Sequence, residues 1–216
     1  MAEITVPLPD VGECYGHAWR QMLRVFLELL IITVVLLLLS MPLAGFETAD
    51  AEGFAPFLFL IFLITLAYLV LFYRPLEYGV AYASLRAARG ESVEISDMFS
   101  FFPNYPNAVL AHILVGFLTG VGVMFCVVPG IYIACKLAFV PYLVIDRNMG
   151  AIEAIRESWR LTDGHALNIF LIGVLAIPIV LGGLLLCGVG VLVSSMWIRV
   201  TFASIYHAVT AAEPAD

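Results

Sequence analysis

The chain has 216 residues, of which 62% are hydrophobic and only 12% are charged. A soluble domain is usually about 25% charged, so this composition excludes a soluble fold and indicates a membrane protein. The formal net charge is −7 with only ten Lys and Arg residues. Because the sequence has no basic stripe that would neutralise phosphates, nucleic-acid binding is excluded as well.

Six apolar stretches predict membrane-spanning helices, since a span requires about 20 apolar residues. In chain order they cover residues 25–44, 54–88, 107–127, 129–145, 166–186 and 188–207. The second is long, and we expect it to kink at Pro75, whose ring removes a backbone N–H. Short links join the third span to the fourth and the fifth to the sixth, which predicts tight hairpins. We therefore expect one all-α integral membrane domain, residues 1–216, with six transmembrane helices in three hairpins.

Each hairpin is preceded by a short amphipathic segment, which predicts a cytoplasmic elbow helix in the headgroup layer. The first elbow contains Trp19, and the third contains Trp159 with Arg156 and Arg160 on its polar face. Tryptophan prefers the membrane interface, and arginine extends its charge toward anionic lipid. These elbows either only anchor the bundle or also sense lipid and dock a partner.

The distribution of arginines predicts the orientation of the chain in the membrane. Seven of them fall on one side of the predicted spans: Arg20, Arg24, Arg86, Arg89, Arg147, Arg156 and Arg160. The three links on the opposite side contain no Lys or Arg. We therefore expect both termini to lie in the cytoplasm.

Charged side chains inside the spans are the main lead to function, because a charge in the bilayer is costly. The sequence places five of them there: Arg74, Glu77, Lys136, Arg199 and Glu28. All five are expected in the cytoplasmic half of the bilayer. They predict either a cytoplasm-facing pocket with a surplus of positive charge, suited to an anionic headgroup or solute, or ion pairs that only join helices.

No pattern in the sequence indicates catalysis or a bound metal. None of the four histidines has metal-ligand spacing: His17, His112, His165 and His207. The sequence also lacks a nucleophile elbow and a phosphate-binding loop. We interpret His112 as a packing residue, and we expect no enzyme activity, metal or cofactor.

Small residues predict close packing at several points. Gly116 and Gly120 have the spacing that lets two membrane helices approach closely. Four glycines around the last hairpin are interpreted as packing or turn residues: Gly182, Gly183, Gly188 and Gly190. Cys126 and Cys187 fall near the outer ends of two hairpins, where they either form a disulfide or pack as small apolar residues.

Two sets of residues, covering about half of the chain, resemble a family. The first is Pro129, Gly130, Ile131, Tyr132, Lys136, Pro141, Asp146 to Gly150, Glu153, Ala154, Ser158, Trp159, Gly164 and His165. The second is Pro75, Leu76, Gly79, Arg86, Gly90, Glu91, Asp97, Met98 and Phe99. They are similar to a widespread group of prokaryotic membrane proteins that includes YciC-like proteins and the membrane domain joined to some glycerophosphodiester phosphodiesterases. The resemblance implies a six-helix membrane domain in a lipid or envelope context, without a catalytic signature, and Arg is common in the family where this chain has Lys136.

We therefore expect a non-enzymatic protein of the prokaryotic cytoplasmic membrane whose partners are membrane lipids. Whether it forms a homo-oligomer or joins a partner membrane subunit stays open. The alternative is a small transporter or channel for an anionic solute, with its site at the Pro75 kink, because broken helices expose backbone groups for binding. A third alternative, an enzyme acting on lipid headgroups, would need a nucleophile and a base that the sequence does not bring together.

Overall fold

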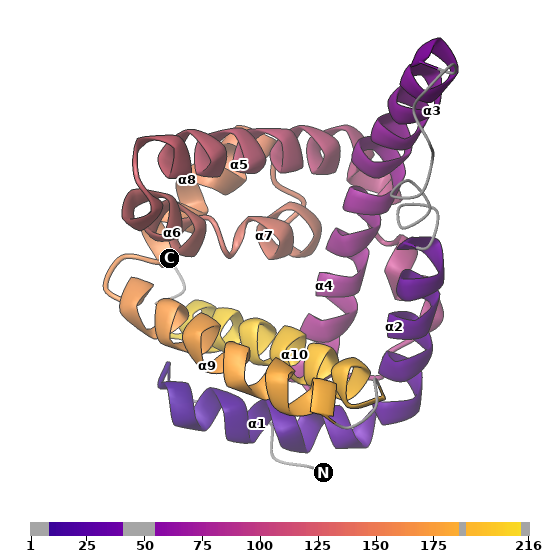
Figure 1. Ribbon diagram of the computed structural model, residues 1–216. Helices are drawn as coiled ribbons and strands as arrows, with labels where there is room; N and C mark the ends of the chain where they lie inside the picture. Colours follow the sequence, from indigo (N-terminus) through magenta and orange to yellow (C-terminus); the bar gives the residue numbers. More distant parts are fainter. Residues whose placement is uncertain (1–8, 41–54, 186–188, 213–216) are drawn as a thin grey trace.

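The computed structural model describes residues 9–40, 55–185 and 189–212, and within these ranges its regular elements are all helices (Figure 1). The α-helices are α1 (Val11–Arg24), α2 (Phe26–Ser40), α3 (Ala55–Tyr68), α4 (Arg74–Ala88), α5 (Tyr105–Phe125), α6 (Val127–Lys136), α7 (Val140–Asp146), α8 (Ala151–Leu161), α9 (Ala166–Leu185) and α10 (Val189–Ala211). A π-helical turn, η2 (Leu69–Tyr73), joins α3 to α4, and two short 3-10 helices, η3 (Ile95–Phe99) and η4 (Phe102–Asn104), precede α5.

Four segments of the described chain are long and apolar enough to cross a membrane: Leu63–Ala88, Ile95–Phe125, Val127–Asp146 and Ala166–Leu185. The pair α1 and α2 would add a fifth if it were one span, although it bends by 93°. These helices are those of a multi-pass, all-α membrane protein. The six spans and the three-hairpin plan exceed this number and stay predictions.

The first predicted elbow, α1, packs against the bundle rather than standing apart from it. The Tyr15 hydroxyl donates a hydrogen bond to the Ile172 carbonyl on α9, and the Trp197 indole on α10 donates to the Tyr15 carbonyl. Trp19 packs edge-on against Trp197, with 4.8 Å between the ring centroids, and is 40% exposed. The amphipathic pattern of α1 therefore reflects burial against α9 and α10, whose contacts hold its apolar face.

Pro75 lies two residues beyond the π-helical turn and leaves one backbone carbonyl without a donor in its own helix. Pro75 follows η2 at the start of α4, and Leu63–Ala88 continues as one helical segment. Pro75 has no N–H to donate to the Leu71 carbonyl four residues earlier. That carbonyl accepts a hydrogen bond from the Tyr105 hydroxyl. Tyr105 of α5 thus supplies the donor that Pro75 lacks.

Within each of two helix pairs, α5 with α6 and α9 with α10, the two helices approach closely at a glycine. A Cβ atom on Gly122 of α5 would lie 3.0 Å from the Gly130 Cα of α6, and one on Gly183 of α9 would lie 2.7 Å from the Gly190 carbonyl oxygen of α10. The contact predicted for Gly116 and Gly120 is wrong for the described residues, because nothing lies within 4 Å of a Cβ atom at either position.

The α5–α6 turn and the close contact between α9 and α10 at Gly183 lie at opposite ends of α9. Val128 and Ile131, beside the α5–α6 turn, line a cavity of about 440 Å³ together with Ala166 and Leu167 at the start of α9. The α9–α10 contact at Gly183 is near the other end of α9. The sequence predicts both turns on one outer side of the membrane, and the structure does not place them together. Cys126 is exposed at the α5–α6 turn, whereas its predicted partner Cys187 lies outside the described residues.

Adjacent glycines of α9 offer a matched stability test. Gly183→Ala is expected to destabilise the protein by about 1–3 kcal/mol, because the added methyl would overlap the Gly190 carbonyl and the Ser194 hydroxyl. Gly182→Ala meets no atom within 4 Å and should stabilise α9 by up to about 1 kcal/mol through helix propensity. Unfolding in mixed micelles measures both changes, and equal effects at the two positions would contradict the packing at Gly183.

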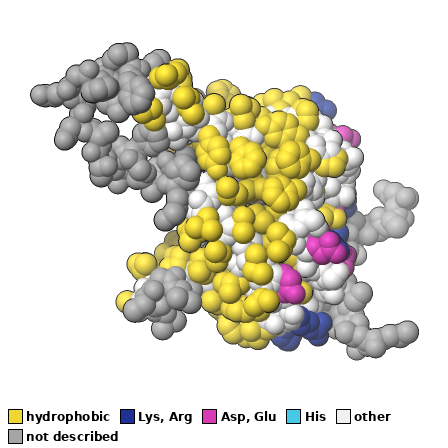
Figure 2. Space-filling view, turned by 90° about the vertical axis from the view of Figure 1, so that its right-hand side faces the viewer, with side chains coloured by type: hydrophobic (Ala, Val, Ile, Leu, Met, Phe, Trp, Pro, Cys, Tyr) yellow, Lys and Arg dark blue, Asp and Glu magenta, His cyan; other side chains and the backbone are white. Residues whose placement is uncertain are grey.

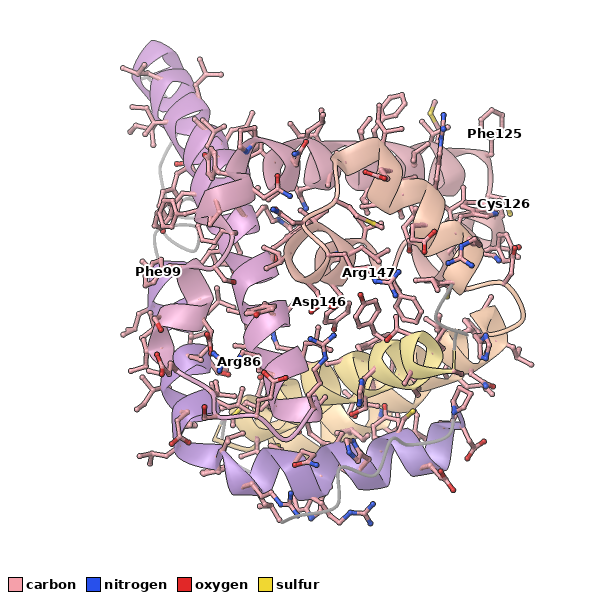
Figure 3. The ribbon with its side chains drawn as sticks, turned by 180° about the vertical axis from the view of Figure 1, so that it is seen from behind. Arg86, Phe99, Phe125, Cys126, Asp146 and Arg147 are labelled. Carbon is pink, nitrogen blue, oxygen red and sulfur yellow. The ribbon has the colours of Figure 1, made fainter. Side chains whose placement is uncertain are left out.

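Ion pairs join helix ends that are distant in sequence. The Arg89 guanidinium after α4 donates two hydrogen bonds to the Asp146 carboxylate at the end of α7, at 2.6 and 2.7 Å, and these hydrogen bonds raise the pKa of Arg89. The Tyr206 hydroxyl on α10 donates to the same carboxylate at 3.2 Å. Figure 3 shows Asp146 and Arg147 near the centre of the molecule and Phe125 and Cys126 at one edge.

The face of the molecule that carries α2 and α3 is largely hydrophobic (Figure 2). On α2, Leu27 and Leu38 are exposed, and on α3, Leu60 and Ile64 are exposed. Charged side chains gather along one edge of this view. This distribution fits contact with the hydrocarbon of a bilayer.

Candidate ligand site

Two adjoining cavities lie between α4, α6, α7 and α10. The larger has a volume of about 680 Å³ and also borders α9, and the smaller has a volume of about 340 Å³ and also borders α5. Both are lined by the same five residues: Ala81, Ala134, Ala138, Pro141 and Arg199. The shared wall makes them two compartments of one candidate site.

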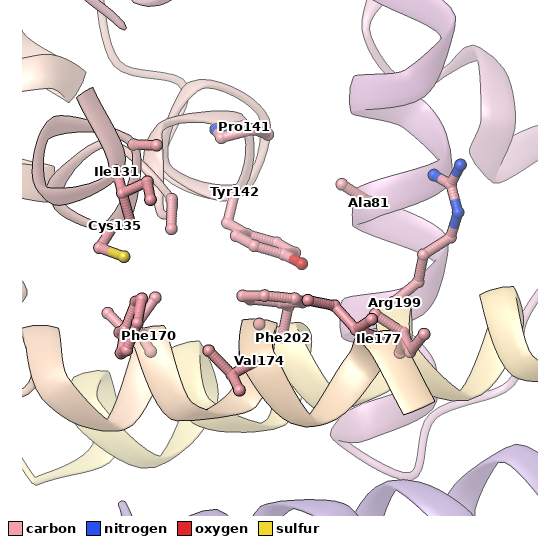
Figure 4. A pocket seen from close by; sticks show the side chains of 15 residues that line it. Ala81, Ile131, Cys135, Pro141, Tyr142, Phe170, Val174, Ile177, Arg199 and Phe202 are labelled. Carbon is pink, nitrogen blue, oxygen red and sulfur yellow. The ribbon is translucent and has the colours of Figure 1, made fainter. Parts of the chain in front are cut away.

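The larger cavity, which we call the apolar compartment, is walled by aromatic and aliphatic side chains. Figure 4 shows the rings of Tyr142 on α7 and Phe202 on α10 near each other, with Phe170 and Ile177 of α9 on either side of them. Among the described residues that line it, Arg199 alone is charged. A cavity with apolar walls and one cationic group at its margin is suited to a ligand with an apolar body and an anionic end.

The smaller cavity, the polar compartment, is lined by Glu77, His112 and Arg199 from α4, α5 and α10. Arg74 donates a hydrogen bond to Glu77 at 3.2 Å, one helical turn away, and both side chains are half-buried. The His112 ring packs edge-on against Tyr78 at 6.4 Å and lies within electrostatic range of Arg74 and Glu77. This part of the bundle therefore collects the polar groups of three helices.

Arg199 joins the two compartments. Its guanidinium makes no hydrogen bond or ion pair within the part of the chain that the structure describes, and Figure 4 shows it pointing toward α4 and away from the apolar rings. The Nε atom of Arg74 is buried and has no partner among the described residues. Because Arg74 pairs with Glu77, Arg199 supplies the remaining positive charge among the described residues that line the site, which is therefore matched to a monoanion.

Of the five charged residues predicted to form one pocket, two line the polar compartment, Glu77 and Arg199, and Arg74 is joined to it through its hydrogen bond to Glu77. Lys136 lies apart from them, buried at the end of α6, where its ammonium pairs with Asp163. Glu28 lies in the first turn of α2 and lines neither compartment. A pocket made of all five is therefore not what the structure forms.

The residues predicted at the membrane interface on α8 differ in their surroundings. Trp159 is exposed by 41% and packs edge-on against Tyr132. Arg160 donates two hydrogen bonds to Glu157, at 2.6 and 2.9 Å, which lowers the pKa of Glu157, whereas Arg156 is exposed. The charge of Arg160 is thus already neutralised by its own helix. Contact of α8 with headgroups stays a prediction.

The sequence interpretation missed His112 and the aromatic wall. The position of His112 could have been used to predict the site, because an ionisable side chain inside a span is itself a functional lead. Its closeness to Glu77 could not, because that depends on the contact between α4 and α5. Tyr142 and Phe202 carry no such signal, since aromatic residues in apolar helices usually pack in the core.

The described residues contain no group of three or more His, Cys, Asp or Glu side chains placed to hold a metal ion. No family model matches the chain, and no solved structure matches its fold.

Proposed function

We propose that this protein is a non-enzymatic membrane protein that binds an anionic amphiphile, such as a membrane lipid, in the two-compartment site. The observation that carries the proposal is the position of Arg199, a guanidinium without a hydrogen bond or ion pair within the described chain, between an apolar and a polar cavity. The acyl chain would occupy the apolar compartment, and the anionic group would meet Arg199, which lines both compartments.

Two features of the site favour such a ligand. The aromatic and aliphatic wall around Tyr142, Phe170 and Phe202 is as apolar as the lipid that surrounds the protein, so an acyl chain can leave the bilayer for the apolar compartment at little cost in free energy. A charge-assisted hydrogen bond to a guanidinium is roughly twice as strong as a neutral one. An amphiphile can use both compartments, whereas a small hydrophilic anion would leave the apolar one unfilled.

We place the protein in a prokaryotic cytoplasmic membrane with both termini inside. Support comes from the one-sided distribution of arginines; two of them, Arg147 and Arg160, lie close enough together to pair with the same carboxylate, Glu157. The family resemblance supports the envelope setting. A cysteine introduced at Ala51 should react with an impermeant maleimide only from outside, and reaction only from the cytoplasm would reverse the orientation.

Lipid retention tests the binding proposal. Protein purified from vesicles of phosphatidylglycerol and phosphatidylethanolamine should retain phosphatidylglycerol by native mass spectrometry. Arg199→Gln is expected to lower that retention by about tenfold, because it removes a charge-assisted contact. Ile177→Trp, which fills the apolar compartment, should lower retention of both lipids.

The matched control is Arg156→Gln, which removes the same charge from an exposed position on α8. Retention in this variant should equal that of the unchanged protein. An unchanged phosphatidylglycerol signal in Arg199→Gln, or an equal loss in both variants, would contradict binding at Arg199.

Transport of an anionic solute is the second candidate, favoured by one observation. The fourth predicted span is broken between α6 and α7, and this break lines the polar compartment through Leu137 and Ala138. Discontinuous helices at a binding site are typical of transporters. Anion flux in liposomes that Arg199→Gln abolishes would support transport, and no flux across a panel of anions would count against it.

A further inference from the structure

We propose that Lys136 is a positioning residue that ties α8 to the end of α6 and thereby shapes the wall of the ligand site. The inference rests on the proposed function for what the site binds, but the tie itself is argued from contacts outside both compartments. The sequence leaves two roles open for Lys136, a direct ligand contact or an ion pair that only joins helices; the proposed role joins helices and through them shapes the ligand site.

The backbone carbonyl of Lys136 is the first part of the tie. Because α6 ends at Lys136, its last carbonyl groups lack partners in the helix, and an unsatisfied carbonyl within a bilayer is costly. The Ser158 hydroxyl donates a hydrogen bond to the Lys136 carbonyl at 2.7 Å. The Thr162 hydroxyl lies 3.3 Å from the same carbonyl but donates to the nearer Ser158 carbonyl, at 2.8 Å. Both residues are fully buried, so α8 caps the end of α6 through Ser158.

The ammonium of Lys136 is the second part of the tie. Its Nζ atom lies 5.7 Å from the ring centroids of both Tyr132 and Trp159 and pairs with the Asp163 carboxylate after α8. The Lys136 side chain is only 2% exposed, whereas that of Asp163 is 70% exposed. A buried cation held by two rings and one carboxylate fixes α6 relative to α8 more firmly than a surface ion pair would.

The tie acts on the residues that build the site. Ala138 and Pro141, which follow shortly after Lys136 in the chain, line both compartments, and Tyr142 lines the apolar one. Cys135, which precedes Lys136, also lines the apolar compartment and is half-buried. Loss of the tie is therefore expected to loosen this wall, exposing Cys135 and weakening retention of the amphiphile.

Cys135 provides a natural reporter of the wall. In full-length protein with Cys126→Ser and Cys187→Ser, the rate at which a membrane-permeant maleimide labels Cys135 is measured alongside phosphatidylglycerol retention. Lys136→Met and Ser158→Ala are expected to raise the Cys135 rate by about tenfold through local opening. Asp163→Asn should act in the same direction but more weakly, because its carboxylate is largely in solvent.

Cys14 separates local opening from unfolding, because it is fully buried between α1 and the bundle. Its labelling should stay slow in all three variants, and Lys136→Arg should largely restore the protection of Cys135. Arg199→Gln should lower phosphatidylglycerol retention without changing the Cys135 rate, and Arg156→Gln should change neither.

Unchanged Cys135 labelling in both Lys136→Met and Ser158→Ala would overturn the tie, as would equal acceleration at Cys135 and Cys14. If the protein with native Lys136 retains no phosphatidylglycerol, the proposed function fails, while the labelling rates still decide whether Lys136 holds the wall.

Discussion

Gly79→Ala is expected to destabilise the protein by about 3 kcal/mol or more, the largest effect expected from an added methyl group at the glycines that the structure describes. A Cβ atom on Gly79 would lie 1.8 Å from the carbonyl oxygen of Met98 and 2.5 Å from its carbonyl carbon. Both are backbone atoms, so no side-chain rotation relieves the overlap. The helix α4 would have to separate from η3, whose Met98 side chain is fully buried. Unfolding in mixed micelles, or loss of folded protein on purification, measures the effect.

Gly116→Ala is the matched control on another membrane helix. Nothing lies within 4 Å of its Cβ position, so the substitution should stabilise α5 by up to about 1 kcal/mol. A Gly79→Ala protein as stable as the unchanged one would show that α4 and η3 do not approach as closely as the structure places them.

Asp146→Ala is expected to cost about 2–3 kcal/mol, less than the 3–5 kcal/mol typical of a fully buried pair because the Arg89 side chain is 26% exposed. The change leaves the Arg89 guanidinium without the carboxylate to which it donates two hydrogen bonds. It also removes the acceptor of the Tyr206 hydroxyl. The three groups join the ends of α4 and α7 to α10, so the loss should weaken the whole centre of the bundle.

A double-mutant cycle isolates the pair. Arg89→Met combined with Asp146→Leu should recover part of the stability lost in Asp146→Ala, because no charge is then left unpaired. Glu91→Ala serves as the control, since its exposed pair with Arg86 at 3.3 Å should contribute less than about 1 kcal/mol. Additive effects of the Arg89 and Asp146 substitutions would contradict a coupled pair.

The positions of the helices follow closely from the apolar pattern. The predicted spans 107–127 and 166–186 match α5 and α9 within two residues at each end, because a long apolar run can satisfy its backbone in lipid only as a helix. The span predicted over 129–145 divides into α6 and α7, and the end of α6 is capped by the Ser158 hydroxyl. Ser158 lies more than twenty residues from Lys136, so a local pattern does not reveal this contact.

Only part of the candidate site was predictable, because the sequence does not show which residues from different helices meet. Counting residues along a helix gives the depth of a charge but not the neighbour that it faces. Arg74 and Glu77 are one turn apart and pair within their own helix. Lys136 instead pairs with Asp163, because α6 contacts the end of α8. The close approach at Gly79 was also missed, because the spacing of glycines does not show which of them meets another backbone.

The sequence by itself determined that this chain is an all-α, multi-pass membrane protein. Its charged residues are scarce and its apolar runs are long, and a long apolar run can satisfy its backbone hydrogen bonds in lipid as a helix. The tertiary structure decided which of the few buried charges meet one another. It left Arg199 between an apolar and a polar cavity and gave Lys136 a carboxylate and two aromatic rings. The difference arises because pairing in the bundle depends on the rotation and packing of helices, which are set by contacts between residues far apart in the sequence.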